Sequence, residues 1–107
     1  MKPGTPAQIE NLLEKVKASI GSEDYRFSSH ATKRGEERFI SYQDALYVLT
    51  NGFHEKKKTI FDSKYRTWKY AIRGKTADSL DTRVVVAFEK GMVIITVIRL
   101  IEKKIGK

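Results

Sequence analysis

The sequence predicts an α+β fold in which N-terminal helices pack on a four-stranded antiparallel meander sheet. Apolar residues recur at helical spacing in the first part of the chain, up to the Asn51-Gly52 pair. From His54 onward apolar and polar residues alternate, and β-branched and aromatic residues become frequent. The turns between these later segments are too short for the crossover that parallel neighbours need, which favours antiparallel strands.

A first helix is expected over residues 6–20. Residues 5–8 have the capping-box pattern, and Pro6 stands at the first helical position, where its missing N–H costs nothing. Apolar residues at i, i+3, i+4, i+7 and i+11 from Ile9 form one stripe, and Gly21 suits the left-handed position that ends a helix. We expect this helix to be structural, because its stripe has to pack on another element.

Two shorter helices are expected before the sheet begins. After a short extended segment at residues 25–28, either Ser28 or Ser29 is expected to cap a short second helix. Ser41 is expected to cap a third helix that has Asp44 at its third position. The Asn-Gly pair that follows is a strong signal for the end of this helix.

Four strands are expected near residues 54–61, 66–74, 82–89 and 92–100. If the large apolar residues face the helices, alternation turns the basic residues the other way. One solution gathers four cations on the open face of the sheet: Lys69, Arg73, Arg83 and Arg99. Thr96 then faces the helices, in register with its apolar neighbours. Lys69, Arg73 and Arg83, together with Thr96, are the candidate nucleic-acid-binding residues. The alternative is that the methylene stems of the cations merely cover an exposed sheet face.

Composition favours a single domain with an anionic partner. The chain has 107 residues, with 21 Lys plus Arg against 13 Asp plus Glu, a formal net charge of +8 and a pI near 9.8. This balance makes a nucleic acid the default partner, and the length suits one domain over residues 1–107. The absence of cysteine excludes disulfides, thiol catalysis and thiolate metal sites. The apolar runs are too short for a membrane span, so we expect a soluble, cytoplasmic protein.

The segment from Ser29 to Ser41 carries the strongest candidate site. His30, Arg34 and Arg38 are spaced by four residues, so on a helix they line one face. An imidazole moves protons near neutral pH, and guanidinium groups bind phosphate. RNA cleavage through the 2′-hydroxyl needs a base, an acid and donors to the phosphoryl oxygens, and one imidazole with several arginines can supply them. Two histidines without clustered carboxylates do not form a metal site. We therefore expect no metal and no cofactor; the alternative is an exposed cationic stripe on an ordinary helix.

Several short motifs occur in a recognisable order, namely Tyr25-x-Phe27-Ser28-x-His30-Ala31, Arg38-x-Ile40-Ser41, Asn51-Gly52 and Ile95-Thr96-Val97-Ile98-Arg99. This order resembles the bacterial domain-of-unknown-function 4258 family, which looks related to BrnT and, more distantly, to the RelE and ParE toxins. The resemblance covers residues 25–100 as a toxin-like core and leaves the extra helix at residues 5–21 outside. It implies a RelE/BrnT-like fold, an RNase activity and a separately encoded antitoxin. The functional positions it implies are His30, Arg34, Arg38 and Arg99, with Thr96 beside them.

Three hypotheses follow for the function. The leading one is a metal-independent endoribonuclease of a toxin-antitoxin system, acting on RNA as an mRNA interferase does. In it His30 is the general acid or base, while Arg34, Arg38 and Arg99 bind phosphate or stabilise the transition state. The second is a non-catalytic nucleic-acid-binding module, in which the same arginines only neutralise phosphate. The third is a protein-binding toxin or accessory factor that uses the apolar first helix or an exposed sheet edge.

Overall fold

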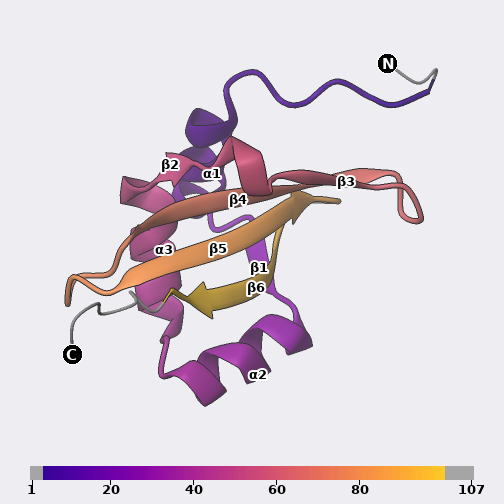
Figure 1. The fold of residues 1–107 in the computed structure, drawn as a ribbon. Coiled ribbons are helices and arrows are strands. Elements are labelled where there is room, and N and C mark those ends of the chain that lie inside the picture. Colours follow the sequence, from indigo (N-terminus) through magenta and orange to yellow (C-terminus); the bar gives the residue numbers. More distant parts are fainter. Residues whose placement is uncertain (1–3, 101–107) are drawn as a thin grey trace, which may run out of the picture.

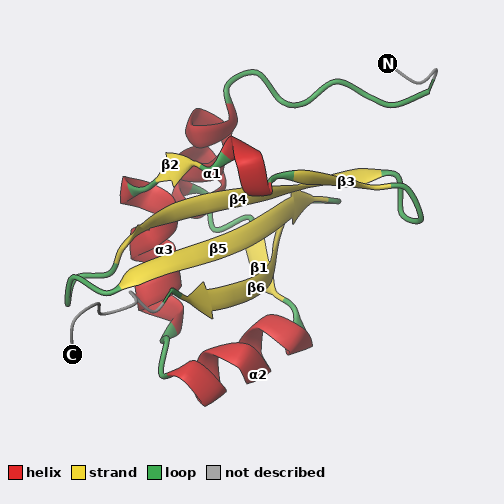
Figure 2. Ribbon diagram, viewed as in Figure 1, coloured by secondary structure: helices red, strands yellow, loops and turns green. Residues whose placement is uncertain are grey.

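Three helices and a mixed, six-stranded sheet form the protein (Figure 1, Figure 2). The structure is a computed structural model that describes residues 4–100, so the expected domain of residues 1–107 extends beyond it at both ends. In chain order the elements are α1 (Leu12–Gly21), β1 (Tyr25–Phe27), α2 (Ser29–Arg38), α3 (Tyr42–Asn51), β2 (Phe53–His54), η1 (Lys56–Lys58), β3 (Ile60–Asp62), β4 (Thr67–Lys75), β5 (Asp81–Phe88) and β6 (Met92–Arg99). The α+β class is therefore confirmed, and the sheet differs from the expected one.

The first helix begins later than the sequence predicts. α1 starts at Leu12, and residues 5–9 are not helical. This segment instead bonds to β4, because Trp68 Nε1 donates to Pro6 O at 2.8 Å and Ile9 N donates to the Tyr70 hydroxyl at 3.0 Å. The capping box predicted at residues 5–8 is wrong, since these tertiary hydrogen bonds outweigh a weak local preference for helix.

α2 and α3 begin where the sequence predicts. The Ser28 Oγ caps α2 by accepting from a backbone N–H in its first turn at 3.0 Å. Ser41 and Asp44 cap α3 reciprocally, each side chain accepting from the other's backbone N–H at 3.0 Å. α3 ends before Gly52, where a Cβ atom would lie 2.5 Å from Arg73 O, so that a side chain has no room. These local signals therefore give the correct bounds for both helices.

The sheet is mixed rather than a four-stranded antiparallel meander. β4, β5 and β6 form the expected meander, in the strand order β1-β6-β5-β4-β2, with β3 also paired to β4. β1 joins the sheet parallel to β6, and the strand expected at residues 54–61 is divided into β2, η1 and β3. The expectation failed because the short-turn argument applies only to strands that follow one another in the sequence. It says nothing about a distant segment such as β1.

A β-bulge in β6 reverses the faces expected at the end of that strand. Val85 pairs with Thr96, but Val86 pairs with Ile94, so one extra residue is inserted in β6. Past the bulge the alternation changes phase by one residue. Arg99 consequently pairs with buried Thr82 on the helix side, and Thr96 lies on the open face. The prediction that placed Arg99 on the open face and Thr96 against the helices is wrong, because unbroken alternation does not allow for an inserted residue.

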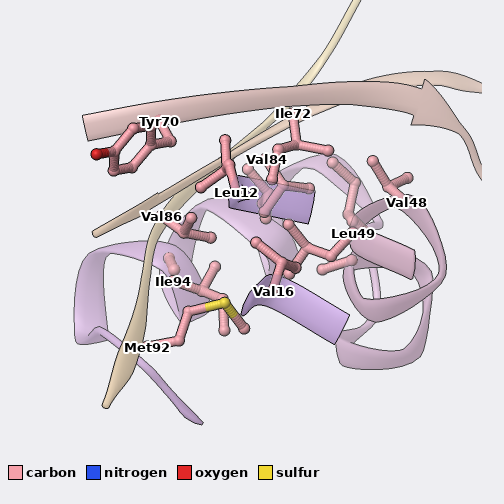
Figure 3. Close-up of a cluster of buried hydrophobic side chains, with 14 residues drawn as sticks. Leu12, Val16, Val48, Leu49, Tyr70, Ile72, Val84, Val86, Met92 and Ile94 are labelled. Carbon is pink, nitrogen blue, oxygen red and sulfur yellow. The ribbon is translucent and has the colours of Figure 1, made fainter. Parts of the chain in front are cut away.

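One hydrophobic core lies between the sheet and the helices (Figure 3). Its buried side chains come from α1, α3 and the three long strands and include Leu12, Val16, Val48, Leu49, Ile72, Val84, Val86, Met92 and Ile94. Burying one such side chain contributes about 1.5–3 kcal/mol. α1 therefore shares a core with the segments that follow it. Between Gly4 and Leu100, no helix is long and apolar enough to cross a membrane.

Candidate functional site

α2 takes the place of a neighbouring strand along the outer edge of β6. β1 pairs with β6 only at residues 92–94. Beyond that point, Ser28 Oγ donates to Ile95 O at 3.0 Å and Arg38 Nη1 donates to Val97 O at 3.2 Å. These side chains satisfy carbonyls that a further strand would otherwise pair. The candidate site is thus built on a helix held firmly at both ends against the sheet.

Two small residues allow α2 to lie close to β6. Ala31 and Gly35, one turn apart, are the buried residues of α2. A Cβ atom at Gly35 would lie 2.7 Å from Ile40 O and 3.8 Å from Val97 Cγ2, so a side chain there would push the helix away. Gly35, which weakens the helix in isolation, is therefore required by its packing. The longer side chains of α2 lie on its two outer flanks.

One flank of α2 carries His30 and Arg34, the first two predicted catalytic residues. His30 is exposed in the first turn, and Arg34 follows one turn later. Arg34 Nη1 lies 2.9 Å from Glu37 Oε1, and both side chains are partly exposed. An exposed pair of this kind contributes roughly 0–1 kcal/mol, so a phosphate group can compete with Glu37 for the guanidinium.

Arg38 and Arg99 meet at the C-terminal end of α2. Arg99 Nη2 donates to Arg38 O and to Phe39 O, each at 3.0 Å, and so caps the last turn of the helix. Within residues 4–100 the buried Arg99 Nε has no hydrogen-bond partner. Both guanidinium groups donate to backbone carbonyls, which carry no net charge. This arginine pair therefore keeps its positive charge.

The predicted catalytic residues thus lie as two pairs and do not line one enclosed pocket. His30 and Arg38 are both on α2, roughly 12 Å apart along its axis at the usual rise of 1.5 Å per residue. β6 brings Arg99 to the Arg38 end. A single phosphate cannot contact both ends of the helix. A nucleic-acid strand that lies along the helix can do so, with successive phosphates at the two pairs.

The basic residues of the open sheet face are paired with carboxylates. Arg83 Nε donates to Glu55 Oε1 at 2.6 Å, and Arg73 Nη1 donates to Glu55 Oε2 at 3.2 Å. Arg73 also makes a bidentate contact with Asp81, at 3.1 and 2.6 Å. We call Glu55, Arg73, Asp81 and Arg83 the Glu55 cluster. Its two positive and two negative charges cancel.

The Glu55 cluster changes the titration of its own members. Hydrogen bonds from Arg83, together with those from Arg73, hold the pKa of Glu55 below its ordinary value. Arg73 likewise lowers the pKa of Asp81. These carboxylates in turn raise the pKa of Arg73, principally through the Asp81 hydrogen bonds. The cluster therefore stays ionised and internally neutral over a wide pH range.

The other two predicted nucleic-acid-binding residues also lie on the open face. Lys69 Nζ is 2.9 Å from Asp62 Oδ2 on the neighbouring strand β3, and its hydrogen bond lowers the pKa of Asp62. Thr96 is half-buried beside its partner Val85. The structure therefore separates Lys69, Thr96 and the Glu55 cluster from the two pairs along α2. The charges of Lys69, Arg73 and Arg83 are largely compensated by carboxylates.

Sequence reasoning missed an aromatic groove between α2 and α3. Phe39 is 87% exposed and Tyr42 is 54% exposed, although both are large hydrophobic residues beside the candidate site. Both rings line a groove of about 570 Å³. The available signal was an aromatic residue placed directly after Arg38, at the end of a polar helix, where glycine is the usual residue.

His54, to which the sequence assigns no role, has a structural one. Its Nε2 lies 2.8 Å from Thr59 Oγ1, and its ring packs edge-on against Tyr70. Burial, with a smaller contribution from the nearby Lys56 charge, lowers the pKa of His54. His54 thus anchors η1 to the sheet. Over residues 4–100, His, Asp and Glu form no cluster of three or more that could hold a metal ion.

Comparison with known proteins places this architecture in a family. Residues 27–99 match the family described as Domain of unknown function (DUF4258), and the chain belongs to that family. The match runs from the end of β1 to the end of β6 and leaves α1 outside. The predicted family is therefore confirmed, and its relation to BrnT and RelE toxins stays a prediction. No curated protein and no solved structure matches this chain.

Proposed function

We propose that this chain is a metal-independent endoribonuclease of the toxin type, with a fold related to those of BrnT and RelE. It acts on RNA in the cytoplasm and is neutralised by a separately encoded antitoxin. One observation carries this proposal: α2 presents His30 and Arg34 on one flank, and β6 supplies Arg99 to Arg38 at the end of the same helix. A proton-transfer group and several phosphate ligands are thereby assembled along a single rigid element.

The chemistry uses the 2′-hydroxyl of RNA as the nucleophile. His30 takes the proton from this hydroxyl, and the oxygen attacks the adjacent phosphorus. Arg34, released from Glu37, binds the phosphoryl oxygens and stabilises the charge that develops on them. The bond to the 5′-oxygen breaks, and water or His30 supplies the proton for that leaving oxygen. The products are a 2′,3′-cyclic phosphate and a 5′-hydroxyl, and DNA is not cleaved because it lacks the nucleophile.

Arg38 and Arg99 hold a second phosphate of the same strand. Their hydrogen bonds to Val97 O, Arg38 O and Phe39 O fix the two guanidinium groups, and each group has further N–H donors. A fixed donor loses less conformational entropy on binding than a free side chain does. In this scheme the second pair sets the position of the strand, and the first pair carries out the reaction.

Cleavage of a labelled, single-stranded RNA in the presence of a chelator tests the proposal. We expect the native chain to produce cyclic-phosphate ends, and we expect His30→Ala to reduce the rate by roughly 100-fold or more, the usual contribution of general acid-base catalysis. Lys33→Ala removes an exposed charge from the same helix and should cleave at nearly the native rate. Equal cleavage by native and His30→Ala protein would exclude His30 from the mechanism.

A non-catalytic nucleic-acid-binding module is the second candidate. It is favoured by the position of His30 on an open surface and by the three adjacent, exposed lysines of η1, Lys56–Lys58. This candidate predicts binding that weakens steeply with salt, similar affinity for RNA and DNA, and no strand scission. Intact RNA after long incubation with saturating, folded protein would favour it over the enzyme.

The proposed antitoxin is tested in cells. Expression of the chain alone should arrest growth, and co-expression with the neighbouring open reading frame should relieve the arrest and yield a complex that purifies intact. A variant with both His30→Ala and Arg38→Ala should no longer arrest growth. Normal growth during high expression of the native chain would contradict a toxin.

A further inference from the structure

α2 and α3 form a groove on the side of α2 away from His30 and Arg34. Its volume is about 570 Å³, and its lining includes Thr32, Glu36, Phe39, Ser41, Tyr42 and Asp44. Thr32 lies two positions after His30, and Glu36 lies two positions after Arg34. Two positions are a little more than half a helical turn, so Thr32 and Glu36 lie on the opposite flank of the helix. The RNase chemistry proposed above leaves this groove without a role.

The backbone holds the Phe39 ring out in solvent. Phe39 has φ 57° and ψ 43°, the left-handed conformation that favours glycine, and its side chain is 87% exposed. Arg99 Nη2 donates to Phe39 O at 3.0 Å and so fixes the backbone at this residue. A large apolar side chain at a strained, exposed position stabilises neither the helix nor the core. The ring therefore offers a large apolar surface to another molecule.

Tyr42 supplies a second aromatic surface in the same groove. Its ring lies against Phe27, with 4.3 Å between ring centroids, and its hydroxyl is 3.1 Å from Thr32 Oγ1. The side chain is nevertheless 54% exposed. Tyr42 is thus a positioned ring with an exposed surface, and it lines the same groove as Phe39. Aromatic side chains of this kind are the usual stacking partners of unpaired nucleobases.

We propose that this groove binds an unpaired guanine base of single-stranded RNA. The inference rests on the proposed function, since it names the feature of the RNA that the same helix would recognise. The base stacks on the Phe39 and Tyr42 rings, and the neighbouring phosphate contacts Arg38 and Arg99 at the end of α2. The groove therefore adjoins the phosphate site of Arg38 and Arg99, on the flank of α2 opposite His30 and Arg34.

The carboxylate of Glu36 supplies the preference for guanine. Glu36 is exposed at the groove, whereas one oxygen of Asp44 already accepts from Ser41 N at 3.0 Å. Guanine presents two adjacent donors on its Watson–Crick edge, the N1–H and the 2-amino group, which match the two oxygens of a carboxylate. Adenine, cytosine and uracil do not present such a pair. Charge-assisted, bidentate contacts are stronger than neutral single ones, so guanine binds best.

Titration of the labelled protein with the four ribonucleoside monophosphates, followed by two-dimensional NMR, tests this site apart from catalysis. GMP should shift the amide signals of Phe39 and Tyr42 and bind at least tenfold more tightly than AMP. Inosine monophosphate, which lacks the 2-amino group, should bind several-fold more weakly than GMP. Glu36→Gln should remove the preference for GMP over AMP.

Substitution of the exposed aromatic ring completes the test. Phe39→Gly suits the observed φ and should keep the fold while weakening GMP binding fivefold or more. Phe53→Ala, which removes a 55% exposed ring on β2, is the matched control and should bind GMP as the native chain does. Undiminished binding by Phe39→Gly, or equal binding of all four nucleotides, would overturn the proposal.

Other outcomes separate this inference from the proposed function. Specific GMP binding in a chain that cleaves no RNA would retain the base site and reject the enzyme. Cleavage without any preference for guanine near the cut would retain the enzyme and reject the base site. Groove signals that shift with protein concentration and not with GMP would identify the groove as a contact between copies of this chain, and would also reject it.

Discussion

The two arginine pairs of this protein have opposite electrostatic surroundings. Arg38 and Arg99, at the end of α2, donate to backbone carbonyls. Arg73 and Arg83 are cross-strand neighbours on the open face, and they donate to the carboxylates of Glu55 and Asp81. A carbonyl orients a guanidinium group and leaves its charge uncompensated. A carboxylate orients the group and also compensates its charge. Arg38 and Arg99 are therefore available to an external anion, whereas Arg73 and Arg83 are already paired with carboxylates.

This difference shows why composition alone misplaces an anion-binding surface. The net charge of +8 makes a polyanionic partner reasonable, but it does not say which cations are free. On the open face the expected basic surface contains a compensating carboxylate near each arginine. The residues to vary are consequently those that distinguish a paired arginine from one bound only to backbone.

Removing the central carboxylate of the Glu55 cluster should have the largest effect on stability. Glu55→Gln leaves Arg73 and Arg83 facing each other with only Asp81 to compensate them, and breaking such a mostly buried ion pair costs about 3 kcal/mol of unfolding free energy. Urea denaturation measures this change. Glu89→Gln, at an exposed position, is the control and should stay within about 0.5 kcal/mol of the native value. A native-like midpoint for Glu55→Gln would mean that the cluster does not stabilise the fold.

Acid should weaken the fold through the same carboxylates, by a smaller amount. The pKa values of Glu55 and Asp81 are lowered in the folded protein, so these groups stabilise it above their unfolded pKa values of about 4. That stabilisation is lost as the pH falls from there through the lower, folded pKa values. Unfolding free energies measured from pH 6 down to about pH 2 should show this decline. The decline should be shallower in Glu55→Gln, and an equal slope in both proteins would exclude Glu55 as its cause.

The smallest effect is expected in the salt dependence of RNA binding. This measurement directly distinguishes the arginines at the end of α2 from those of the Glu55 cluster. Arg38→Gln should reduce the magnitude of the slope of log affinity against log salt by about one unit, because one phosphate contact is lost. Arg73→Gln should leave the slope nearly unchanged, since Arg73 is already engaged by Glu55 and Asp81. Binding of a short, non-cleavable RNA at several salt concentrations provides the measurement. A reduced slope for Arg73→Gln alone would place the RNA on the open face instead.

The elements that were predicted correctly are those with strong local signals. Ser28 and Ser41 cap α2 and α3 through bonds that span three residues, so the information lies within a few positions of the chain. The three long strands are rich in β-branched and aromatic residues, and short turns join them as antiparallel neighbours. The family motifs lie mostly in these same elements, which is why the family was identified from residues alone.

Features that depend on distant contacts could not be derived in this way. Tyr70 and Trp68 hold residues 5–9 out of a helix from more than sixty positions away. β1 pairs with β6, which is also more than sixty positions away, and the bulge in β6 exists only in relation to its pairing with β5. Each of these outcomes is a competition between a local preference of a few tenths of a kcal/mol and tertiary hydrogen bonding and packing, which is larger.

The candidate site combines both kinds of information. The spacing of His30, Arg34 and Arg38 was enough to place them on one helix, because helical periodicity is a property of the local sequence. Three other features could be seen only in the folded chain. Arg99 lies beside Arg38, Glu55 pairs with Arg73 and Arg83, and the Phe39 side chain is exposed. Charge compensation and exposure depend on which distant residues fold together, and a one-residue bulge was sufficient to move Arg99 from one face of the sheet to the other.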